Sequence, residues 1–310
     1  MSASEGSPAT ALPTVPKGIP PAEVEVDEDL VRALLRDQHP DLADLPVHPY
    51  ATGWDNVTFR LGDEFAVRMP RISGAVPLLR SEQRWLPLLA EMLPVPVPVP
   101  VRAGVAGPGY PWPWSVLRWV PGRSAEHGEP APGEAPAFGR FLAALHRPAP
   151  AEAPRSTYRG VPLNTLDSVA RRLALLPGLT ADLPVDWTEL ARFWDAAREV
   201  PCDVPETWVH GDLHPKNIVV DDGRFAAVLD WGDMSVGDRA TDLAAAWMLF
   251  PVTAHDALWE AYGPVSESTR TRALGWALFF GTMLLETGIA NDPPFAEIGR
   301  RTLTRVAASL

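Results

Sequence analysis

Apolar and polar residues alternate along two short segments near residue 60, which predicts two neighbouring strands. In residues 57–61 the apolar side chains occupy every second position, and they do so again in residues 65–69. This period of two is typical of strands that bury one face. The sequence Gly62-Asp63-Glu64 between the two segments suits a tight turn. We therefore predict a β-hairpin in which Ala66 and Arg68 share the face opposite to the apolar residues of the second strand.

A second hairpin is predicted near residue 220, after a polar loop. Residues 207–209 form a short apolar run that leads into this loop, and residues 218–220 leave it as a strand. Residues 221–223 read Asp-Asp-Gly, which is a turn sequence, and residues 225–229 return as the second strand. The hairpin should therefore bring Asp230 back beside the end of the loop.

Helical spacing of apolar residues predicts a helix after the first hairpin. Glu82 falls inside its apolar stripe, which consists of Leu78, Leu79, Trp85, Leu86 and Leu89. A carboxylate on a buried stripe needs a partner, because a buried unpaired charge costs several kcal/mol. Arg68 is the natural partner; alternatively, Glu82 lies at the edge of the stripe beside Arg80 or Arg84. Pro87 should kink or shorten this helix.

The remaining segments predict a mostly helical second half. Helical patterns cover residues 138–146, 239–250 and 272–289, and the last of these is apolar enough to be central. Prolines alternate with other residues through 93–100, which indicates an extended polyproline-like connector or a sheet edge. Residues 122–136 are rich in Pro, Gly and Glu and are interpreted as a mobile connection.

The loop and the second hairpin together carry the main chemical signal. Residues 210–217 read His-Gly-Asp-Leu-His-Pro-Lys-Asn, and residues 230–232 read Asp-Trp-Gly. Asn217 and Asp230, at the open end of one hairpin, offer the oxygen ligands that Mg²⁺ prefers. Asp212 precedes them in the loop, where its carboxylate can accept a proton from an incoming hydroxyl. This division of roles is the template of phosphoryl transfer.

Two other interpretations of this loop remain open from the residues alone. The loop could be a polar connection whose Asp and His residues cap turns. Alternatively, His210, Asp212 and His214 could bind a transition metal, although no further Cys or His clusters with them in the sequence. No Walker P-loop and no Gly-x-Gly-x-x-Gly fingerprint occurs, which argues against the common P-loop and Rossmann nucleotide sites.

The two motifs at 210–217 and 230–232 resemble those of the aminoglycoside phosphotransferase family, kinase-like enzymes that phosphorylate hydroxyls of small molecules. Residues 237–239 (Gly-Asp-Arg) and 242–244 (Asp-Leu-Ala) resemble a later segment of the same family. The resemblance extends over roughly residues 45 to 290.

The resemblance implies a two-lobed, protein-kinase-like α+β fold. Residues 22–120 would form an N-terminal nucleotide-binding lobe with an antiparallel sheet. Residues 121–310 would form a larger, mostly helical lobe for catalysis and substrate binding. Residues 1–21 are rich in Ala, Pro and Ser, lack the pattern of a signal peptide, and are expected to be a disordered tail.

The same resemblance implies roles for residues of the N-terminal lobe. Ala66 would lie under the adenine, and Arg68 would hold the α- and β-phosphates in place of the usual lysine of the family. Arginine is always charged and can bind phosphate oxygens in a bidentate manner, so the exchange is physically tenable. Glu82 would position Arg68. The alternative interpretation of Arg68 is an exposed strand arginine.

Two further nucleotide contacts follow from the family pattern. Gly53 lies in a segment, residues 51–56, where a phosphate-covering loop is expected, and a glycine lets backbone amides approach an anion. Residues 115–120 would be the strand that leads to the interlobe hinge. Backbone groups of Arg118 and Val120 would bind the adenine edge there.

In the second lobe, the resemblance assigns Asp212 as the catalytic base and Asn217 and Asp230 as Mg²⁺ ligands. The phosphate donor would be ATP or GTP. His210 and His214 are expected to support the loop through hydrogen bonds.

Two later acids have structural interpretations. Asp238 follows Gly237 at the start of a predicted helix and is expected to cap its free amides. Asp242 either braces the catalytic loop or is a solvated acid of the first helical turn.

The acceptor is predicted only as a class. By resemblance, it would be an antibiotic or related natural product, such as an aminoglycoside or a macrolide, modified in resistance or self-protection. A metabolite kinase for a sugar or an amino alcohol is the enzymatic alternative. A pseudokinase that binds nucleotide without turnover is the non-enzymatic one, and the arginine at position 68 is the feature that keeps it open.

Composition narrows the partners. The net charge of −12 disfavours nucleic acid and anionic membranes. The single cysteine, Cys202, excludes a disulfide framework and indicates a reducing compartment, so a cytoplasmic location is expected. No uninterrupted apolar stretch reaches 18 residues, so no transmembrane helix is predicted. The sequence does not indicate an oligomeric state.

Overall fold

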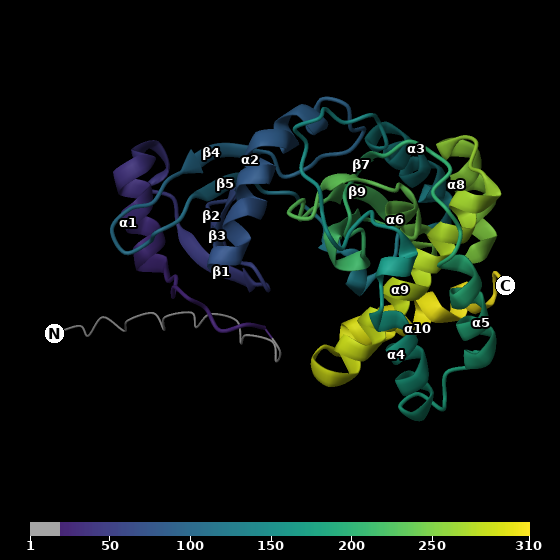
Figure 1. The fold of residues 1–310 in the computed structure, drawn as a ribbon. Coiled ribbons are helices and arrows are strands. Elements are labelled where there is room, and N and C mark those ends of the chain that lie inside the picture. The colour runs from purple at the N-terminus through teal and green to yellow at the C-terminus, as the bar shows by residue number, and fades with distance from the viewer. Residues whose placement is uncertain (1–18) are drawn as a thin grey trace. The chain divides into compact units, whose positions relative to one another are not determined.

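The computed structural model describes residues 19–310, which fall into two compact units (Figure 1). Unit 1 contains the described residues through Gln83 together with Val99–Trp119, and unit 2 contains Arg84–Pro98 and Val120–Leu310. The division after Trp119 falls one residue before the boundary expected from the sequence, and Arg84–Pro98 groups with unit 2. Of the expected N-terminal tail, residues 1–18 lie outside the described residues.

Unit 1 contains an antiparallel sheet, one helix before it in the chain and the first part, residues 76–83, of a second helix. Among the described residues, the sheet has five strands in the order β1-β2-β3-β5-β4. Their bounds are β1 Val47–Thr52, β2 Asn56–Leu61, β3 Phe65–Pro70, β4 Pro100–Gly104 and β5 Trp114–Arg118. Helix α1, Glu28–Gln38, begins at Asp27, whose side chain accepts from the Leu30 amide at 2.8 Å.

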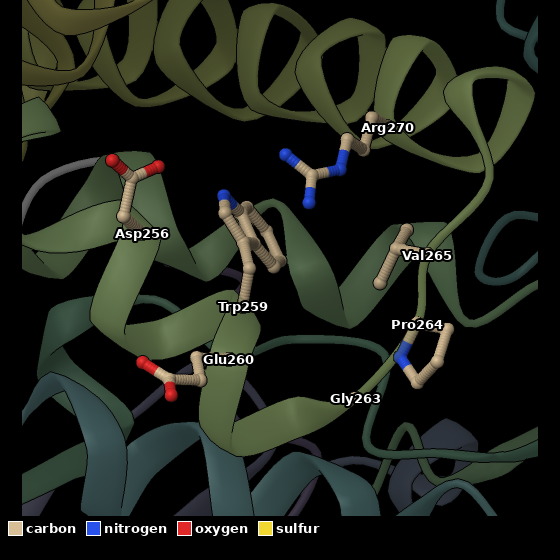
Figure 2. A pocket seen from close by; sticks show the side chains of 7 residues that line it. All are labelled: Asp256, Trp259, Glu260, Gly263, Pro264, Val265 and Arg270. Carbon is tan, nitrogen blue, oxygen red and sulfur yellow. The ribbon is translucent and has the colours of Figure 1, made fainter.

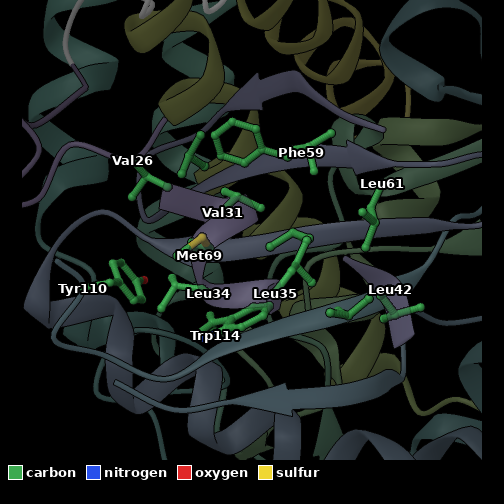
Figure 3. Packing of buried hydrophobic residues seen from close by; sticks show 14 residues of the cluster. Val26, Val31, Leu34, Leu35, Leu42, Phe59, Leu61, Met69, Tyr110 and Trp114 are labelled. Atoms are coloured by element: carbon green, nitrogen blue, oxygen red, sulfur yellow. The ribbon is translucent and has the colours of Figure 1, made fainter. Parts of the chain in front are cut away.

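The predicted first hairpin is confirmed, and its apolar face forms the core of unit 1. Val57, Phe59 and Leu61 of β2 are at most 4% exposed. They pack with buried residues of α1, including Leu34 and Leu35 (Figure 3). Because burial of such a side chain contributes about 1.5–3 kcal/mol, this alternation fixes which face of the sheet is covered.

Helix α2, Val76–Ala90, follows the hairpin as predicted and crosses the division between the units after Gln83. Pro87 lies inside the helix, which continues for three more residues. The proline therefore ends the helix within one turn and not at its own position. The proline-rich run that follows has no regular structure until β4 begins at Pro100, and β4 is an edge strand of the sheet.

Unit 2 contains most of the helices and two small sheets. Its strands are β6 Arg123–Ser124, β7 Thr207–Val209, β8 Ile218–Asp221, β9 Arg224–Val228 and β10 Ser235–Gly237, paired in the orders β6-β8-β9 and β10-β7. Its further helices are α3 Ala135–Leu145, α4 Ser168–Leu175, α5 Trp187–Ala197, α6 Ala240–Leu243, α7 Ala245–Leu249, α8 His255–Tyr262, α9 Glu267–Asn291 and α10 Pro293–Ala307.

Two expectations for unit 2 need correction. The helix predicted over 239–250 is divided at Ala244 into two shorter helices, α6 and α7, although the backbone of Ala244 itself keeps helical dihedral angles. Residues 122–136 were interpreted as a mobile connection, but β6 pairs with β8 and so joins the sheet of the second hairpin. A pattern rich in Pro and Gly does not reveal a two-residue strand of this kind, because its pairing is set by a partner nearly 100 residues later.

Helix α9 is the central apolar helix that the sequence predicts. It lies beside α10 (Figure 1), and the contact is close because a Cβ at Gly288 would lie 1.9 Å from the Ala296 nitrogen. Within residues 19–310, α9 alone is long and apolar enough to cross a membrane by length and composition. However, 72% of the relevant window is buried inside the protein, as in the core helix of a globular protein.

Candidate active site

The loop at residues 210–217 leads from β7 into the β8–β9 hairpin. A short 3-10 turn, Pro215–Asn217, ends the loop, and β8 begins at the next residue. On the returning strand the Leu229 amide donates to the Asn217 carbonyl at 2.8 Å. This bond brings Asp230 beside Asn217, as the hairpin pattern predicts.

Asp212 lies at the centre of a network of hydrogen bonds and ion pairs. The Asn217 Nδ2 donates to the Asp212 carbonyl at 2.9 Å and to its Oδ2 at 3.4 Å. The His214 Nε2 lies 3.2 Å from the same Oδ2, and the Arg159 Nη2 donates to Oδ1 at 2.8 Å. Burial would raise the pKa of the Asp212 carboxyl, but the charges of His214 and Arg159 outweigh it and lower that pKa below its ordinary value. Asp212 is therefore an anion at neutral pH, ready to accept a hydrogen bond.

Asn217 and Asp230 have the donor chemistry of a hard divalent cation. The amide nitrogen of Asn217 points to Asp212, so its amide oxygen is the atom left for a ligand. Asp230 is exposed and has a φ of 55°, in the left-handed region that non-glycine residues seldom adopt. One amide oxygen and one carboxylate fit Mg²⁺, which takes its remaining ligands from phosphates and water.

Asp242 holds the start of the loop at residues 210–217 through two backbone hydrogen bonds. This carboxylate is fully buried and accepts from the His210 amide at 2.7 Å and the Gly211 amide at 2.8 Å. The His146 Nε2 lies 3.4 Å from its Oδ2. Of the two interpretations left open for Asp242, the structure supports the brace and not the solvated acid. Two amides on one carboxylate fix the loop backbone just before Asp212.

The two histidines of the loop support it through hydrogen bonds. The His210 Nδ1 accepts from the Asp212 amide at 3.2 Å, and its Nε2 lies 3.0 Å from the Leu229 carbonyl. Both ring nitrogens of His210 thus face backbone, which does not support a transition-metal site there. No group of three His, Cys, Asp or Glu that could hold a metal occurs in the described part of the chain.

Asp238 has the capping role that the sequence predicts and a second role that it does not. Its Oδ1 accepts from the Ala240 amide at 3.0 Å, at the start of α6. Its Oδ2 also accepts from the Arg272 Nε at 2.6 Å. Arg272 is 1% exposed, and its Nη1 reaches Asp203 at 3.1 Å. The sequence does not indicate that Arg272 pairs with Asp238 and Asp203. Arg272 lies in helix α9, whose neighbouring residues are mostly apolar.

Arg159 and Asp233 were also missed by the sequence interpretation. Arg159 contacts Asp212 at 2.8 Å and Asp233 at 3.1 Å, and it comes from an irregular segment more than 50 residues before the loop. Asp233, directly after the Asp-Trp-Gly sequence at residues 230–232, had no predicted role. No local pattern could have revealed either residue, since the contact depends on the tertiary path of the segment.

In unit 1, Arg68 and Glu82 form the predicted pair. Their Nη1 and Oε1 atoms lie 2.7 Å apart, and the two residues are 8% and 4% exposed. Arg80 and Arg84 are exposed. With its amide oxygen turned toward Arg68, Asn56 accepts from Nε at 3.2 Å and from Nη2 at 3.1 Å. Arg68 is thus a held cation and not a surface strand arginine.

The other expected nucleotide contacts of unit 1 lie near this pair. Ala66 is 6% exposed on β3, two positions before Arg68. Gly53 lies in the turn between β1 and β2, where its amide donates to the Asn56 carbonyl at 2.8 Å. Arg71, which the sequence interpretation missed, donates from Nη1 to the Gly53 carbonyl at 3.1 Å and so steadies the turn.

The expected adenine contacts lie at the end of β5. Arg118 is the last residue of this strand and pairs with Phe65 of β3. The next amide, that of Trp119, donates to the Glu64 carbonyl at 2.7 Å. Val120 follows as the first residue after the division into unit 2.

A shallow hollow of about 490 Å³ lies elsewhere in unit 2, between α8 and the start of α9 (Figure 2). The guanidinium of Arg270 lies over the Trp259 ring at 5.3 Å, and the acids Asp256 and Glu260 also line the hollow. None of the expected site residues lines it.

The family model of the phosphotransferase enzyme family, APH, matches residues 46–276. No curated protein matches the chain. Among solved structures, aminoglycoside 2'-phosphotransferase-IIIa as its GDP complex is 17% identical, with a TM-score of 0.65, and the match covers 92% of this chain and 100% of that one. Macrolide 2'-phosphotransferase MphH from Brachybacterium faecium is 22% identical, with a TM-score of 0.57 and coverages of 89% and 97%.

These structural matches establish a kinase-like α+β fold. The family model covers well over half of the chain and includes residues 210–217 and 230–232 in full. The chain therefore belongs to the phosphotransferase enzyme family, as the resemblance in its motifs indicates, and it is a kinase-type enzyme.

Proposed function

We propose that this protein transfers the γ-phosphate of ATP or GTP to a hydroxyl of a small molecule, an antibiotic or a related natural product. The observation that carries the proposal is the arrangement of Asp212 and Asn217 in one braced loop, with Asp230 returning beside them. One ionised carboxylate next to two oxygen ligands is what a phosphotransferase needs at its acceptor side.

Asp212 acts on the acceptor. The hydroxyl donates a hydrogen bond to this carboxylate, which aligns its oxygen with the γ-phosphorus. A bond forms from the acceptor oxygen to phosphorus, and the bond from phosphorus to the β-γ bridging oxygen breaks. The hydroxyl proton passes to Asp212, and the nucleoside diphosphate leaves.

Asn217 and Asp230 would hold Mg²⁺, which when bound neutralises charge on the β- and γ-phosphates. In unit 1, Arg68 would contact the α- and β-phosphates, and Glu82 would keep its guanidinium in place.

Four further contacts are proposed for the nucleotide. Gly53 would bring the backbone of the β1–β2 turn toward the phosphates, and Ala66 would leave room for the adenine ring. Backbone groups of Arg118 and Val120 would recognise the edge of that ring.

The choice of acceptor and donor follows the relatives. One neighbour, 17% identical with a TM-score of 0.59, was solved with GDP and kanamycin. Another, 15% identical, was solved with ADP, and two are macrolide 2'-phosphotransferases. An aminoglycoside or a macrolide is accordingly the first acceptor to test, and both ATP and GTP are donors to test.

The test is a screen for ADP or GDP release across aminoglycosides, macrolides, nucleosides, sugars and amino alcohols, with wild-type protein and Asp212→Asn. The proposal predicts acceptor-dependent release that is lost in the variant. If only sugars or amino alcohols stimulate the release of ADP or GDP, the acceptor is a metabolite and not an antibiotic. Equal release by Asp212→Asn would contradict the role of Asp212.

A further inference from the structure

The segment at residues 154–160, here called the strap, runs against the catalytic region without forming a helix or strand. Two backbone hydrogen bonds hold it there. The Val236 amide donates to the Pro154 carbonyl at 2.8 Å, and the Asp238 amide donates to the Gly160 carbonyl at 2.8 Å. The strap is thereby fixed at both ends to the chain that follows the metal motif.

The strap also lies close against the loop that carries Asp212. A Cβ at Gly237 would lie 2.6 Å from the Gly160 carbonyl oxygen, so a side chain there would displace the strap. Gly211, with a φ of 86°, would place a Cβ 3.1 Å from the Arg159 Cβ and 2.9 Å from the Asp233 carbonyl oxygen. These two glycines allow the backbones to approach, and the approach delivers Arg159 to the loop.

Arg159 joins two carboxylates on either side of the metal motif. Its Nη2 donates to Oδ1 of Asp212 at 2.8 Å, and its Nε donates to Oδ2 of Asp233 at 3.1 Å. The hydroxyl of Tyr158 donates to the other oxygen of Asp233 at 2.9 Å. The guanidinium lies over the Phe280 ring of α9 at 5.3 Å, and the Arg159 side chain is 12% exposed.

We propose that Arg159 is a positioning residue that fixes the rotamer of Asp212 by tying its carboxylate to Asp233. This inference rests on the proposed function. A planar guanidinium holds its donors in a fixed fork, so it sets both the distance and the plane of the carboxylate that it binds.

The geometry separates this role from mere structural support. Asp242 accepts from the backbone amides of His210 and Gly211, and Arg272 donates to the carboxylate of Asp238. Both act at a distance from the carboxylate of Asp212. Arg159 contacts the reacting carboxylate itself. Loss of its side chain should therefore disturb the alignment of the acceptor and leave the nucleotide bound as before.

The experiment compares Arg159→Ala with Arg155→Ala. Arg155 is on the same strap, but its side chain is 63% exposed and pairs with Glu206 at the surface. Turnover is followed as release of ADP or GDP with kanamycin or a macrolide as acceptor, and with water as acceptor where neither reacts. For Arg159→Ala, kcat should fall about 100-fold, the cost of a misplaced reacting group, while the KM for nucleotide changes less than about twofold. Arg155→Ala should keep the wild-type kcat.

Guanidinium ion added at millimolar concentration should restore part of the kcat of Arg159→Ala, because it can occupy the space left beside Asp212. It should have no such effect on Arg155→Ala. A crystal structure of Arg159→Ala should show the Asp212 carboxylate in a changed rotamer. If Arg159→Ala does not fold, Arg159→Lys supplies a single charge without the fork and should show a lowered kcat at an unchanged melting temperature.

Wild-type kcat in Arg159→Ala or Arg159→Lys, or an Asp212 rotamer unchanged in the variant, would overturn the inference. A parallel loss in kcat and nucleotide affinity without rescue would do the same, since it would indicate structural support alone. Failure of the proposed function is distinguishable, because Asp212→Asn would then retain turnover. If Asp212→Asn is inactive and Arg159→Ala is fully active, only the present inference fails.

Discussion

The two units hold their functional side chains by different means. In unit 1, Arg68 and Glu82 project from a regular strand and a regular helix, and their ion pair crosses only 14 positions of sequence. In unit 2, Asp212 projects from an irregular loop. That loop is held by Asp242 and Arg159, which come from segments 30 to 53 positions away.

The difference shows what each kind of site requires. A strand and a helix have fixed side-chain directions, so contacts from neighbouring elements, Glu82 on α2 and Asn56 on β2, are enough to hold the cation in place. An irregular loop has no hydrogen-bond ladder of its own, so its amides need outside acceptors. The buried Asp242 supplies two of them, which explains why a charge is tolerated at a fully buried position.

The largest effect is expected at the reacting carboxylate of unit 2. Asp212→Asn should lower kcat about 100- to 10,000-fold, the range that a positioned general base contributes. The affinity for nucleotide, measured by calorimetry, should change little, because the variant keeps the loop backbone and leaves Asn217, a proposed metal ligand, in place. Asp221→Asn, at the exposed end of strand β8 in the same hairpin, is the matched control and should retain turnover. Similar kcat values for both variants would remove the catalytic role from Asp212.

The brace of the loop should come next. Asp242→Ala leaves the His210 and Gly211 amides without their acceptor, at about 1–3 kcal/mol for each buried group. Urea unfolding should therefore show a clear loss of stability, and turnover should fall with it. Asp256→Ala removes an exposed acid of α8 and should be nearly neutral. A stable and active Asp242→Ala variant would mean that the loop holds itself, and the contrast between the units would disappear.

In unit 1, removal of Glu82 should act on stability and on nucleotide binding together. Glu82→Ala breaks a buried ion pair, a change that typically costs about 3–5 kcal/mol. The freed guanidinium of Arg68 should also hold phosphate less well, which raises the KM for nucleotide. Glu91→Ala, an exposed change just after α2, is the control for both measurements. An unchanged KM for nucleotide in Glu82→Ala would contradict a role of Arg68 in nucleotide binding.

The smallest expected effect is on the pH dependence of stability, through Asp203, which pairs with Arg272 next to Asp238. Hydrogen bonds, chiefly from Ser266 and then from Arg272 and Thr269, lower the pKa of Asp203 from 3.8 to about 2, although burial raises it. Since the pKa is lower in the folded state, this stabilisation is complete above pH 3.8 and is lost as the pH falls toward 2. The denaturant midpoint of wild type should therefore decline more steeply over that window than that of Asp203→Asn. Parallel curves would show that Asp203 is not coupled to folding, and Asp195→Asn, an exposed acid of α5, should follow the wild-type curve.

The same contrast explains what the sequence could predict. The pair of Arg68 and Glu82 was predictable, because periods of two and of 3.6 residues place side chains on known faces. The return of Asp230 to Asn217 was predictable from one hairpin. The contacts of Arg159 and Arg272 were not, since they depend on tertiary paths that leave no local pattern in an irregular strap or an apolar helix.

Irregular pairing also limited the prediction of the fold. The two-residue strand β6 is defined by its partner β8, and its own proline- and glycine-rich surroundings favour a connection. The break between α6 and α7 could not be predicted either, because residues 240–249 contain no proline or glycine. At β6 a tertiary contact decided what local propensity left open.

The central claim is that Asn217 and Asp230 hold the metal of a bound nucleotide beside Asp212. A crystal structure of the protein with Mg²⁺ and a non-hydrolysable ATP or GTP analogue tests it most directly. We predict a metal ion at about 2.0–2.1 Å from the amide oxygen of Asn217 and from a carboxylate oxygen of Asp230, with the γ-phosphate facing Asp212. A metal bound by other residues, or a γ-phosphate remote from Asp212, would contradict the account.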